Sequence, residues 1–320
     1  MRSLPSNPNA SPRPPDPFQM WDFLLDPLSY SFMQRSLLVA VIVGVICSVV
    51  GSYLIVQRLS LLGDAISHSL LPGLAIAFWL GINIYVGAFV AGVLSTVLIA
   101  WIHRRSPIKE DAAMGIVLSS FFALGITLIT LIQKENKIDL NHFLFGNILS
   151  VTPGEVRDIA LIAVLVLACV VLLYKELLFY SFDPLGAQAA GLPVNLLNLG
   201  LMLLIALTVV ASMKAVGVVL VLALLITPGA TAYLLVPRFH QVMGLGTLLG
   251  VVSSISGMYL SYYFNLPSGP AIVLVSSALF FLALLFSPSQ GVFTQPRTRT
   301  GGESGLWREI KALWSGLKSR

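Results

Sequence analysis

Charged residues are scarce in this chain of 320 residues, because Asp, Glu, Lys and Arg together make up only 10% of it. A soluble globular domain carries roughly 25% charged residues, so the composition excludes an ordinary water-soluble domain. Hydrophobic residues account for 57% of the sequence, and the mean hydropathy is +0.89. They form long runs rather than alternating segments of about ten residues, which favours helices over a transmembrane barrel. We therefore expect an all-α integral membrane protein.

Several motifs that would indicate an enzyme are also absent. The chain has no G-x-x-x-x-G-K-[ST] nucleotide loop and no HExxH zinc-protease motif, so ATP hydrolysis would require a separate chain. The two cysteines, Cys47 and Cys169, lie within apolar runs and predict no disulfide framework. The first thirty residues are rich in Pro, Ser and Asn and lack the apolar stretch of a secretory signal. We interpret residues 1–34 as a disordered tail.

Nine apolar segments are long enough to cross a bilayer as helices, which takes about 20 residues each. The second segment is the least regular because it contains Asp64 and His68, so eight complete spans plus one broken or re-entrant helix is the alternative count. Together the segments predict a polytopic helical bundle over residues 35–290. They cover 37–57, 61–80, 82–102, 112–132, 159–177, 195–214, 216–236, 241–263 and 269–286.

The distribution of Lys and Arg predicts the orientation, because cytoplasmic loops carry an excess of them. The loop after the third segment, "HRRSPIKED", is basic, and so is the tail at 291–320, whereas the loops "GINIY" and "NLPSGP" carry no charge. The N-terminus is therefore expected outside and the C-terminus in the cytoplasm. The tail also predicts an amphipathic helix near 305–318 on the membrane surface or, alternatively, on a partner subunit. Its positive charge favours anionic lipid and not nucleic acid.

The loop "FYSFDPLGAQAAGLPVN" predicts a short helix between two spans. Asp183 is a good N-cap, Pro184 fits the first turn, and Gly191 is a good stop signal. A helix is expected at about 184–190, within an element near 183–192 on the cytoplasmic side. The small residues Gly186 and Ala187 would allow another protein to approach closely. The simpler alternative is an ordinary capped connector.

The segment "GDAISHSLLPGLAIAF" places Asp64 four residues before His68, and so on the same face of a helix. An unpaired carboxylate at a helix centre in the membrane costs about 2.5–3.5 kcal/mol, so Asp64 needs a partner or water. Carboxylate oxygen and imidazole nitrogen together suit a transition metal, and a second copy of the chain could complete the ligand shell. The simpler alternative is that Asp64 caps the helix and His68 packs nearby.

Two Pro-Gly pairs interrupt apolar segments in the two halves of the chain. Pro72-Gly73 follows His68 in the second segment, and Pro228-Gly229 lies in the seventh. Proline removes a backbone donor, so both helices can bend there, as broken helices along a substrate path do. Packing kinks are an equally good reading of the pattern alone.

The scarcity of ionisable residues in the other apolar segments bears on the class of transporter. A secondary transporter usually has more than one buried ionisable site, so a translocation subunit driven by an external motor fits this sequence better. An ion-coupled secondary transporter is the alternative.

These features together resemble the permease subunits of bacterial ATP-binding-cassette importers for manganese, zinc and sometimes iron. The resemblance covers nearly all of residues 35–286. It depends on five blocks in the family's order: "GSYLIVQRLSLLGDAISHSLLPGLAIA", "DAAMGIVLSSFFALGI", "LNHFLFGNILSVT", "FDPLGAQAAGLP" and "VGVVLVLALLITPGATAYLL". It implies a type II importer fold in the bacterial plasma membrane. It also implies a homodimer with a central pore, two cytoplasmic ATPase subunits and an extracytoplasmic metal-binding protein.

The same resemblance implies roles for particular residues. The helix after Asp183 matches the family's coupling helix, although Leu185 stands where the family often has an acidic residue. Asp64 and His68 match the family's metal path, whereas no metal role is carried over to His142. No permanently bound cofactor is expected, only the transported Mn²⁺ or Zn²⁺. Manganese is the first choice because a carboxylate tolerates harder ions, with zinc second.

Overall fold

The computed structural model describes residues 26–132, 146 and 148–287, and every regular element in those ranges is helical. The expected disordered tail and the expected amphipathic helix near 305–318 lie largely or wholly outside the described residues. The helices are η1 (Pro27–Ser29), α2 (Ser31–Val56), α3 (Ser60–Ser69), α4 (Leu71–Leu80), α5 (Ile84–Arg105), α6 (Glu110–Ile132), η2 (Ile148–Ser150), α8 (Pro153–Leu172), α9 (Tyr174–Phe182), α10 (Pro184–Ala189), α11 (Val194–Val216), α12 (Val218–Leu235), α13 (Phe239–Phe264) and α14 (Ser268–Phe286).

The described residues contain eight spans that are long and apolar enough to cross a membrane, or nine if α8 and α9 form one span. This confirms the all-α polytopic fold. The first span begins at Ser31, a little before the expected domain start at position 35. The strongest bend falls in the fifth segment, where α8 and α9 meet at 68°, and not in the second segment as expected. Lys175 and Glu176 lie directly after this bend, and charged side chains are costly in the hydrocarbon region.

The second segment is also interrupted, but more gently, between α3 and α4. Leu70 separates the two helices, and Pro72 occupies the first turn of α4. Proline has no N–H to donate to the carbonyl four residues earlier, which here belongs to His68. The break therefore follows the predicted metal-binding pair by two residues.

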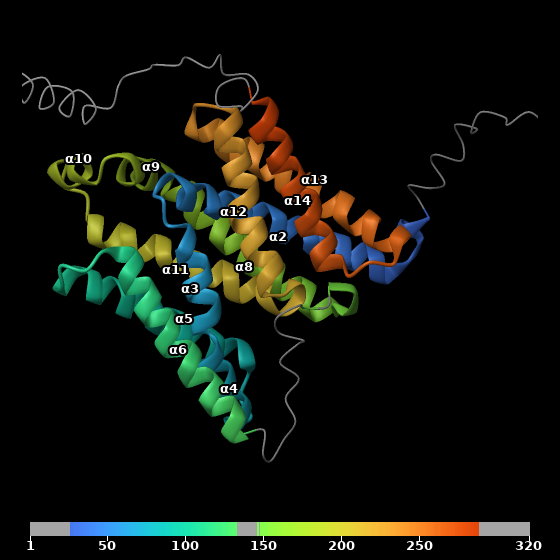
Figure 1. Ribbon diagram of the computed structural model, residues 1–320, viewed down its shortest axis with the longest axis horizontal. Coiled ribbons are helices and arrows are strands. Elements are labelled where there is room, and N and C mark those ends of the chain that lie inside the picture. Colours follow the sequence, from blue (N-terminus) through green and yellow to red (C-terminus); the bar gives the residue numbers. More distant parts are fainter. Residues whose placement is uncertain (1–25, 133–145, 147, 288–320) are drawn as a thin grey trace, which may run out of the picture.

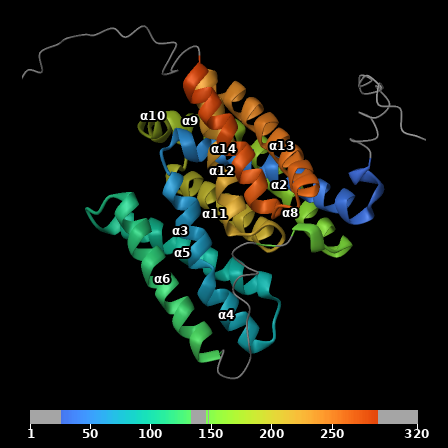
Figure 2. The same ribbon diagram turned by 45° about the vertical axis from the view of Figure 1, so that its right-hand side comes forward.

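The helices form two groups with α11 between them (Figures 1 and 2). One group contains α3, α4, α5 and α6, and the other contains α2, α12, α13 and α14. Helix α11 contacts α5 and α3 on one side and α2, α8 and α12 on the other. Helix α2 lies at the centre of the larger group. It is the most buried span, with 72% of an apolar stretch of 18 residues inside the molecule.

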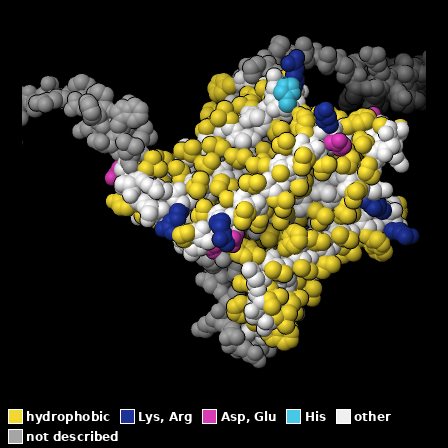
Figure 3. Space-filling model, turned by 180° about the vertical axis from the view of Figure 1, so that it is seen from behind, with side chains coloured by type: hydrophobic (Ala, Val, Ile, Leu, Met, Phe, Trp, Pro, Cys, Tyr) yellow, Lys and Arg dark blue, Asp and Glu magenta, His cyan; other side chains and the backbone are white. Residues whose placement is uncertain are grey.

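Small residues allow α2 to lie very close to its neighbours. A Cβ atom added at Gly51 would overlap the backbone carbonyl of Leu225 in α12. A Cβ at Gly44 would lie 2.8 Å from the Ser254 hydroxyl oxygen of α13. Lipid chains are as apolar as leucine side chains, so membrane helices associate through such close packing rather than through a hydrophobic driving force. The outer surface is mostly apolar, as Figure 3 shows for the face opposite to that of Figure 1.

The contact between Gly51 and Leu225 predicts a large effect of a single methyl group. Gly51→Ala should destabilise the protein by about 1–3 kcal/mol, the usual cost of overpacking a core. Gly244→Ala is the matched control, because nothing lies within 4 Å of a Cβ at this exposed α13 position. Thermal unfolding of the purified protein in detergent measures both variants. Equal midpoints would contradict the close approach of α2 and α12.

Candidate metal-binding pair and coupling helix

Asp64 and His68 face each other one turn apart on α3. The distance from Asp64 Oδ1 to His68 Nε2 is 3.4 Å, and the side chains are 42% and 28% exposed, respectively. Two donors that each lie about 2.1 Å from one ion at a right angle are about 3 Å apart. The observed separation is therefore close to what a shared metal ion requires, and only a small side-chain adjustment would bring both atoms onto it.

The position of Asp64 within α3 argues against the simpler reading as a helix cap. Helix α3 starts at Ser60 and has Leu59 as its N-cap, so Asp64 lies in the second turn. Asp64 and His68 also lie on the one accessible strip of α3, which continues through Leu61, whereas most other α3 residues are buried. The fold thus leaves open the face that carries the two donor groups.

The neighbours of the pair come from α6 and α12. The His68 ring meets the Phe122 ring of α6 edge to face, with 5.3 Å between centroids. Next to Asp64, a Cβ atom at Gly63 would lie 2.8 Å from Leu225 Cδ2 of α12. Helix α3 is therefore held between α6 and α12, and Phe122 limits the positions available to the imidazole.

The described part of one chain supplies only two of the ligands that a metal ion needs here. The described residues contain no group of three or more His, Cys, Asp or Glu side chains that could hold a metal ion. Asp64 and His68 give two donors, whereas a closed structural site normally has four. The pair can bind an ion weakly and release it, or bind it more tightly if another molecule adds ligands.

The two Pro-Gly pairs have different surroundings. A Cβ at Gly73 would overlap the Gly87 carbonyl of α5, and the reverse is true of Gly87, so α4 and α5 touch there. Pro228 lies inside α12, which remains one helix, and Gly229 packs at ordinary distances against Ser52 and the neighbouring α2 backbone. Close packing of α4 against α5 therefore accounts for Gly73.

The expected helix between two spans is present as α10. The Asp183 carboxylate accepts a hydrogen bond from the Gly186 backbone N–H at 2.8 Å, Pro184 occupies the first turn, and Gly191 has a φ of +83°. The N-terminal cap, the proline and the terminal glycine therefore act as the sequence predicts.

The small residues of α10 serve the fold of the helix itself. Ala187 is completely buried within the chain, and a side chain at Gly186 would collide with the Asp183 carboxylate that caps the helix. Ala187 is therefore not available to another protein, and Gly186 is only partly exposed. The exposed large hydrophobic residue of α10 is Leu185, which is 79% accessible.

Contacts between distant segments place α10 and the start of α3 at the same end of the bundle. The Gln57 side chain, at the end of α2, donates a hydrogen bond from Nε2 to Ser181 Oγ of α9 at 2.9 Å. Arg104 of α5 donates to the Asn195 carbonyl of α11, also at 2.9 Å. Sequence reasoning missed Gln57, Ser181 and Phe122, because nothing in a local pattern indicates which distant side chain each one meets.

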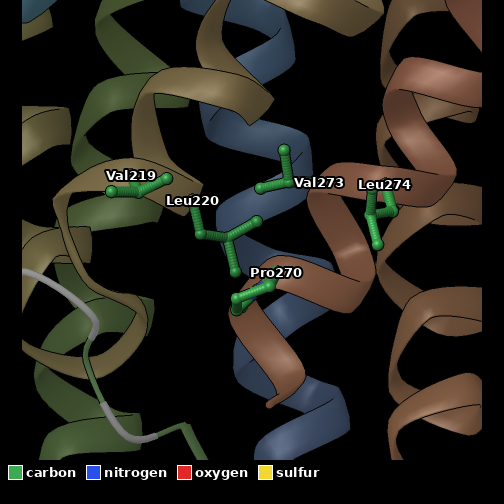
Figure 4. Close-up of a pocket in the computed structure, with 6 residues that line it drawn as sticks. Val219, Leu220, Pro270, Val273 and Leu274 are labelled. Atoms are coloured by element: carbon green, nitrogen blue, oxygen red, sulfur yellow. The ribbon is translucent and has the colours of Figure 1, made fainter. Parts of the chain in front are cut away.

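The structure also has an apolar pocket of about 250 Å³ between the first turns of α12 and α14 (Figure 4). Its lining has no group that could bind a metal ion, so it is separate in chemistry from the Asp64–His68 pair. The pocket is lined by Val219, Leu220, Gly269, Pro270, Val273 and Leu274.

Comparison with known proteins gives the family. The ABC 3 transport family matches residues 29–287. The chain is 46% identical over 270 residues to the manganese transport system membrane protein MntC of Listeria monocytogenes, covering 84% of this chain and 96% of that protein. It is 42% identical over 268 residues to a probable iron transport system membrane protein of Haemophilus influenzae, covering 84% and 98%.

The fold agrees with a solved structure of PsaBC from Streptococcus pneumoniae in complex with Fab. The TM-score is 0.76 at 39% sequence identity, and the match covers 85% of this chain and 97% of that chain. These findings favour the ATP-driven importer over the ion-coupled secondary transporter. With its eight or nine candidate spans, the chain belongs to the ABC 3 transport family as a multi-pass plasma membrane permease, a translocation subunit rather than an enzyme.

Proposed function

We propose that this permease carries a divalent transition metal ion past Asp64 and His68, with Mn²⁺ as the first choice of ion and Zn²⁺ as the second. The observation that carries the proposal is the accessible carboxylate–imidazole pair, with 3.4 Å between Asp64 Oδ1 and His68 Nε2. An anionic oxygen and a neutral nitrogen suit Mn²⁺, Fe²⁺ and Zn²⁺, and the carboxylate favours the harder ions. Relatives described as manganese transport proteins support manganese, and the probable iron transport relative keeps Fe²⁺ as a competitor to test.

A second copy of the chain would complete the ligand shell. Two protomers related by a two-fold axis would bring two Asp64–His68 pairs together and supply four donors. The exposed surface of α6, the helix that contacts His68, supports this arrangement, because hydroxyl groups lie there among its large apolar residues. Ser119, Thr127 and Thr130 are exposed there, and each donates to a carbonyl of its own helix. Such residues are typical of helix–helix contacts and water-lined paths in membranes.

Helix α10 is the proposed contact with the cytoplasmic ATPase. It lies at the end of the bundle where cationic loop residues gather, which supports a cytoplasmic C-terminus and an outside N-terminus. The opposite end has Arg35 and Arg157, and Arg157 lies 3.7 Å from Asp158. An extracytoplasmic metal-binding protein would deliver the ion there, and membrane lipid would surround the apolar surface. The cationic residues at this end of the bundle include Arg58, Arg104, Arg105, Lys109, Lys175 and Arg238.

The first prediction concerns the driving force. The permease alone in liposomes should not take up ⁵⁴Mn²⁺, and uptake should require its ATPase partner, ATP and the binding protein, because the sequence has no nucleotide loop. Competition by unlabelled Mn²⁺, Zn²⁺ and Fe²⁺ in the complete system gives the order of preference. Uptake by the permease alone would refute the proposal.

The second prediction concerns the metal path. Asp64→Asn and His68→Ala should each lower Mn²⁺ uptake at least about tenfold, because even the outer partners of metal ligands contribute about 10–100-fold. Expression and ATPase binding should be unchanged, because both side chains lie on an accessible strip of α3 and not on α10. Asp158→Asn is the matched control, since this carboxylate is 56% exposed at the other end of the bundle. Normal uptake by Asp64→Asn would show that the carboxylate is not on the path.

The third prediction concerns docking of the ATPase. Leu185→Lys should weaken co-purification of the ATPase at least about tenfold, because a positive charge would have to be buried without a partner. Leu185→Met keeps the apolar surface and should behave like the unchanged protein. Full binding and normal uptake by Leu185→Lys would mean that α10 is only a connector. Gly186 and Ala187 are unsuitable positions for this test, because changes there would disturb α10 itself.

A further inference from the structure

A side-chain hydrogen bond joins α9, the helix that leads into α10, to the end of α2, from which the chain turns into α3. Gln57 Nε2 donates to Ser181 Oγ at 2.9 Å, and both residues are partly buried. Ser181 uses its own proton for the Leu177 carbonyl at 2.7 Å, so its hydroxyl oxygen accepts from Gln57. The bond joins the end of α2 to the last turn of α9.

On the Ser181 side, α9 and α10 form one continuous arm. Asp183 ends α9, because its backbone N–H donates to the Phe179 carbonyl at 3.0 Å. The same residue begins α10, because its carboxylate caps that helix through Gly186. With no free linker between the two helices, a displacement of α10 must also move the last turn of α9, which contains Ser181.

On the Gln57 side, the chain turns sharply into α3 with little freedom. Arg58 has a φ of +60°, which is a left-handed conformation. Its N–H donates to the Ile55 carbonyl at 3.1 Å, and the Leu59 N–H donates to the Leu54 carbonyl at 2.9 Å. These two bonds form a Schellman motif, a tight closure that usually has glycine at the position of Arg58. Helix α3 begins directly afterwards at Ser60.

An aromatic contact keeps the arm against the bundle but does not reach α3. The Phe239 ring at the start of α13 meets Phe182 at 5.9 Å and Tyr174 at 6.5 Å, so it touches both ends of α9. It also meets Tyr53 of α2 at 4.9 Å. These ring contacts reach α2 at Tyr53, one helical turn before Gln57. The Gln57–Ser181 hydrogen bond lies directly next to the turn into α3.

We infer that the Gln57–Ser181 hydrogen bond is the joint through which α10 sets the position of α3, and with it the access to Asp64 and His68. This inference rests on the proposed function of α10 as the ATPase contact. Gln57 and Ser181 are positioning residues, because neither touches the metal-binding pair. Loss of the bond should separate ATP hydrolysis from transport while leaving the permease folded and bound to its ATPase.

A double-mutant cycle tests the joint in the complete complex in liposomes. Gln57→Leu and Ser181→Ala should each lower the Mn²⁺ imported per ATP hydrolysed by about threefold or more, the size expected of one hydrogen bond between membrane helices. The double variant should lose no more than either single one, because both remove the same bond. Ser181→Thr keeps the hydroxyl and should restore the ratio. Additive losses, or an unchanged ratio in Gln57→Leu, would overturn the inference.

A matched control and a second readout separate this inference from the proposed function. Gln34→Leu makes the same chemical change at the other end of α2, where Gln34 Nε2 donates to the Leu28 carbonyl, and it should leave the ratio unchanged. Equal loss in Gln34→Leu would overturn the inference. ATPase binding with ATP should also alter hydrogen exchange of amides 57–64, and Gln57→Leu should abolish that response. Absence of Mn²⁺ uptake by the unchanged complex would refute the proposed function. The hydrogen-exchange comparison would still show whether the Gln57–Ser181 bond transmits ATPase binding to amides 57–64.

Discussion

A carboxylate within a membrane helix needs a partner, and the region around α3 is arranged around this requirement for Asp64. Insertion of an unpaired charge costs about 2.5–3.5 kcal/mol, which is a large fraction of the stability of most domains. His68 one turn away supplies a partner at 3.4 Å, and the accessible strip of α3 admits water or an ion. The pair is therefore tolerated without being closed off, as the proposed role in carrying an ion requires.

Close packing of small residues produces this exposed strip. Gly63 lets α3 approach α12, Gly51 lets α12 approach α2, and Gly73 lets α4 approach α5. Because α3 is surrounded on its other faces by α5, α6, α11 and α12, only the face with Asp64 and His68 remains accessible. Gly73, which suggested a bend in the sequence, thus serves the close approach of two helix backbones, as is common in membrane bundles.

The sequence predicted the spans well because apolar length is a local property that the bilayer imposes on each helix. It predicted α10 well because Asp183, Pro184 and Gly191 act through their own backbone. It did not predict the 68° bend between α8 and α9, which lies just before Lys175 and Glu176. It could not predict Gln57 with Ser181, or His68 with Phe122, since each contact joins segments whose approach is decided by the packing of other helices.

The position of Asp64 and His68 along α3 determines the distance over which a movement of α10 would have to be transmitted. Asp64 is four residues after the start of α3, so the turn next to Gln57 lies about 6 Å along the helix axis from it. A rigid helix segment of this length transmits a tilt of its first turn directly to the Asp64 carboxylate. Beyond the pair, the break at Leu70 separates α3 from α4, which is held against α5 through Gly73 and Gly87. In the coupling that we infer, a movement of α3 would change access to the pair without displacing α4, because the interruption after His68 would confine the motion to the half of the span nearer α10.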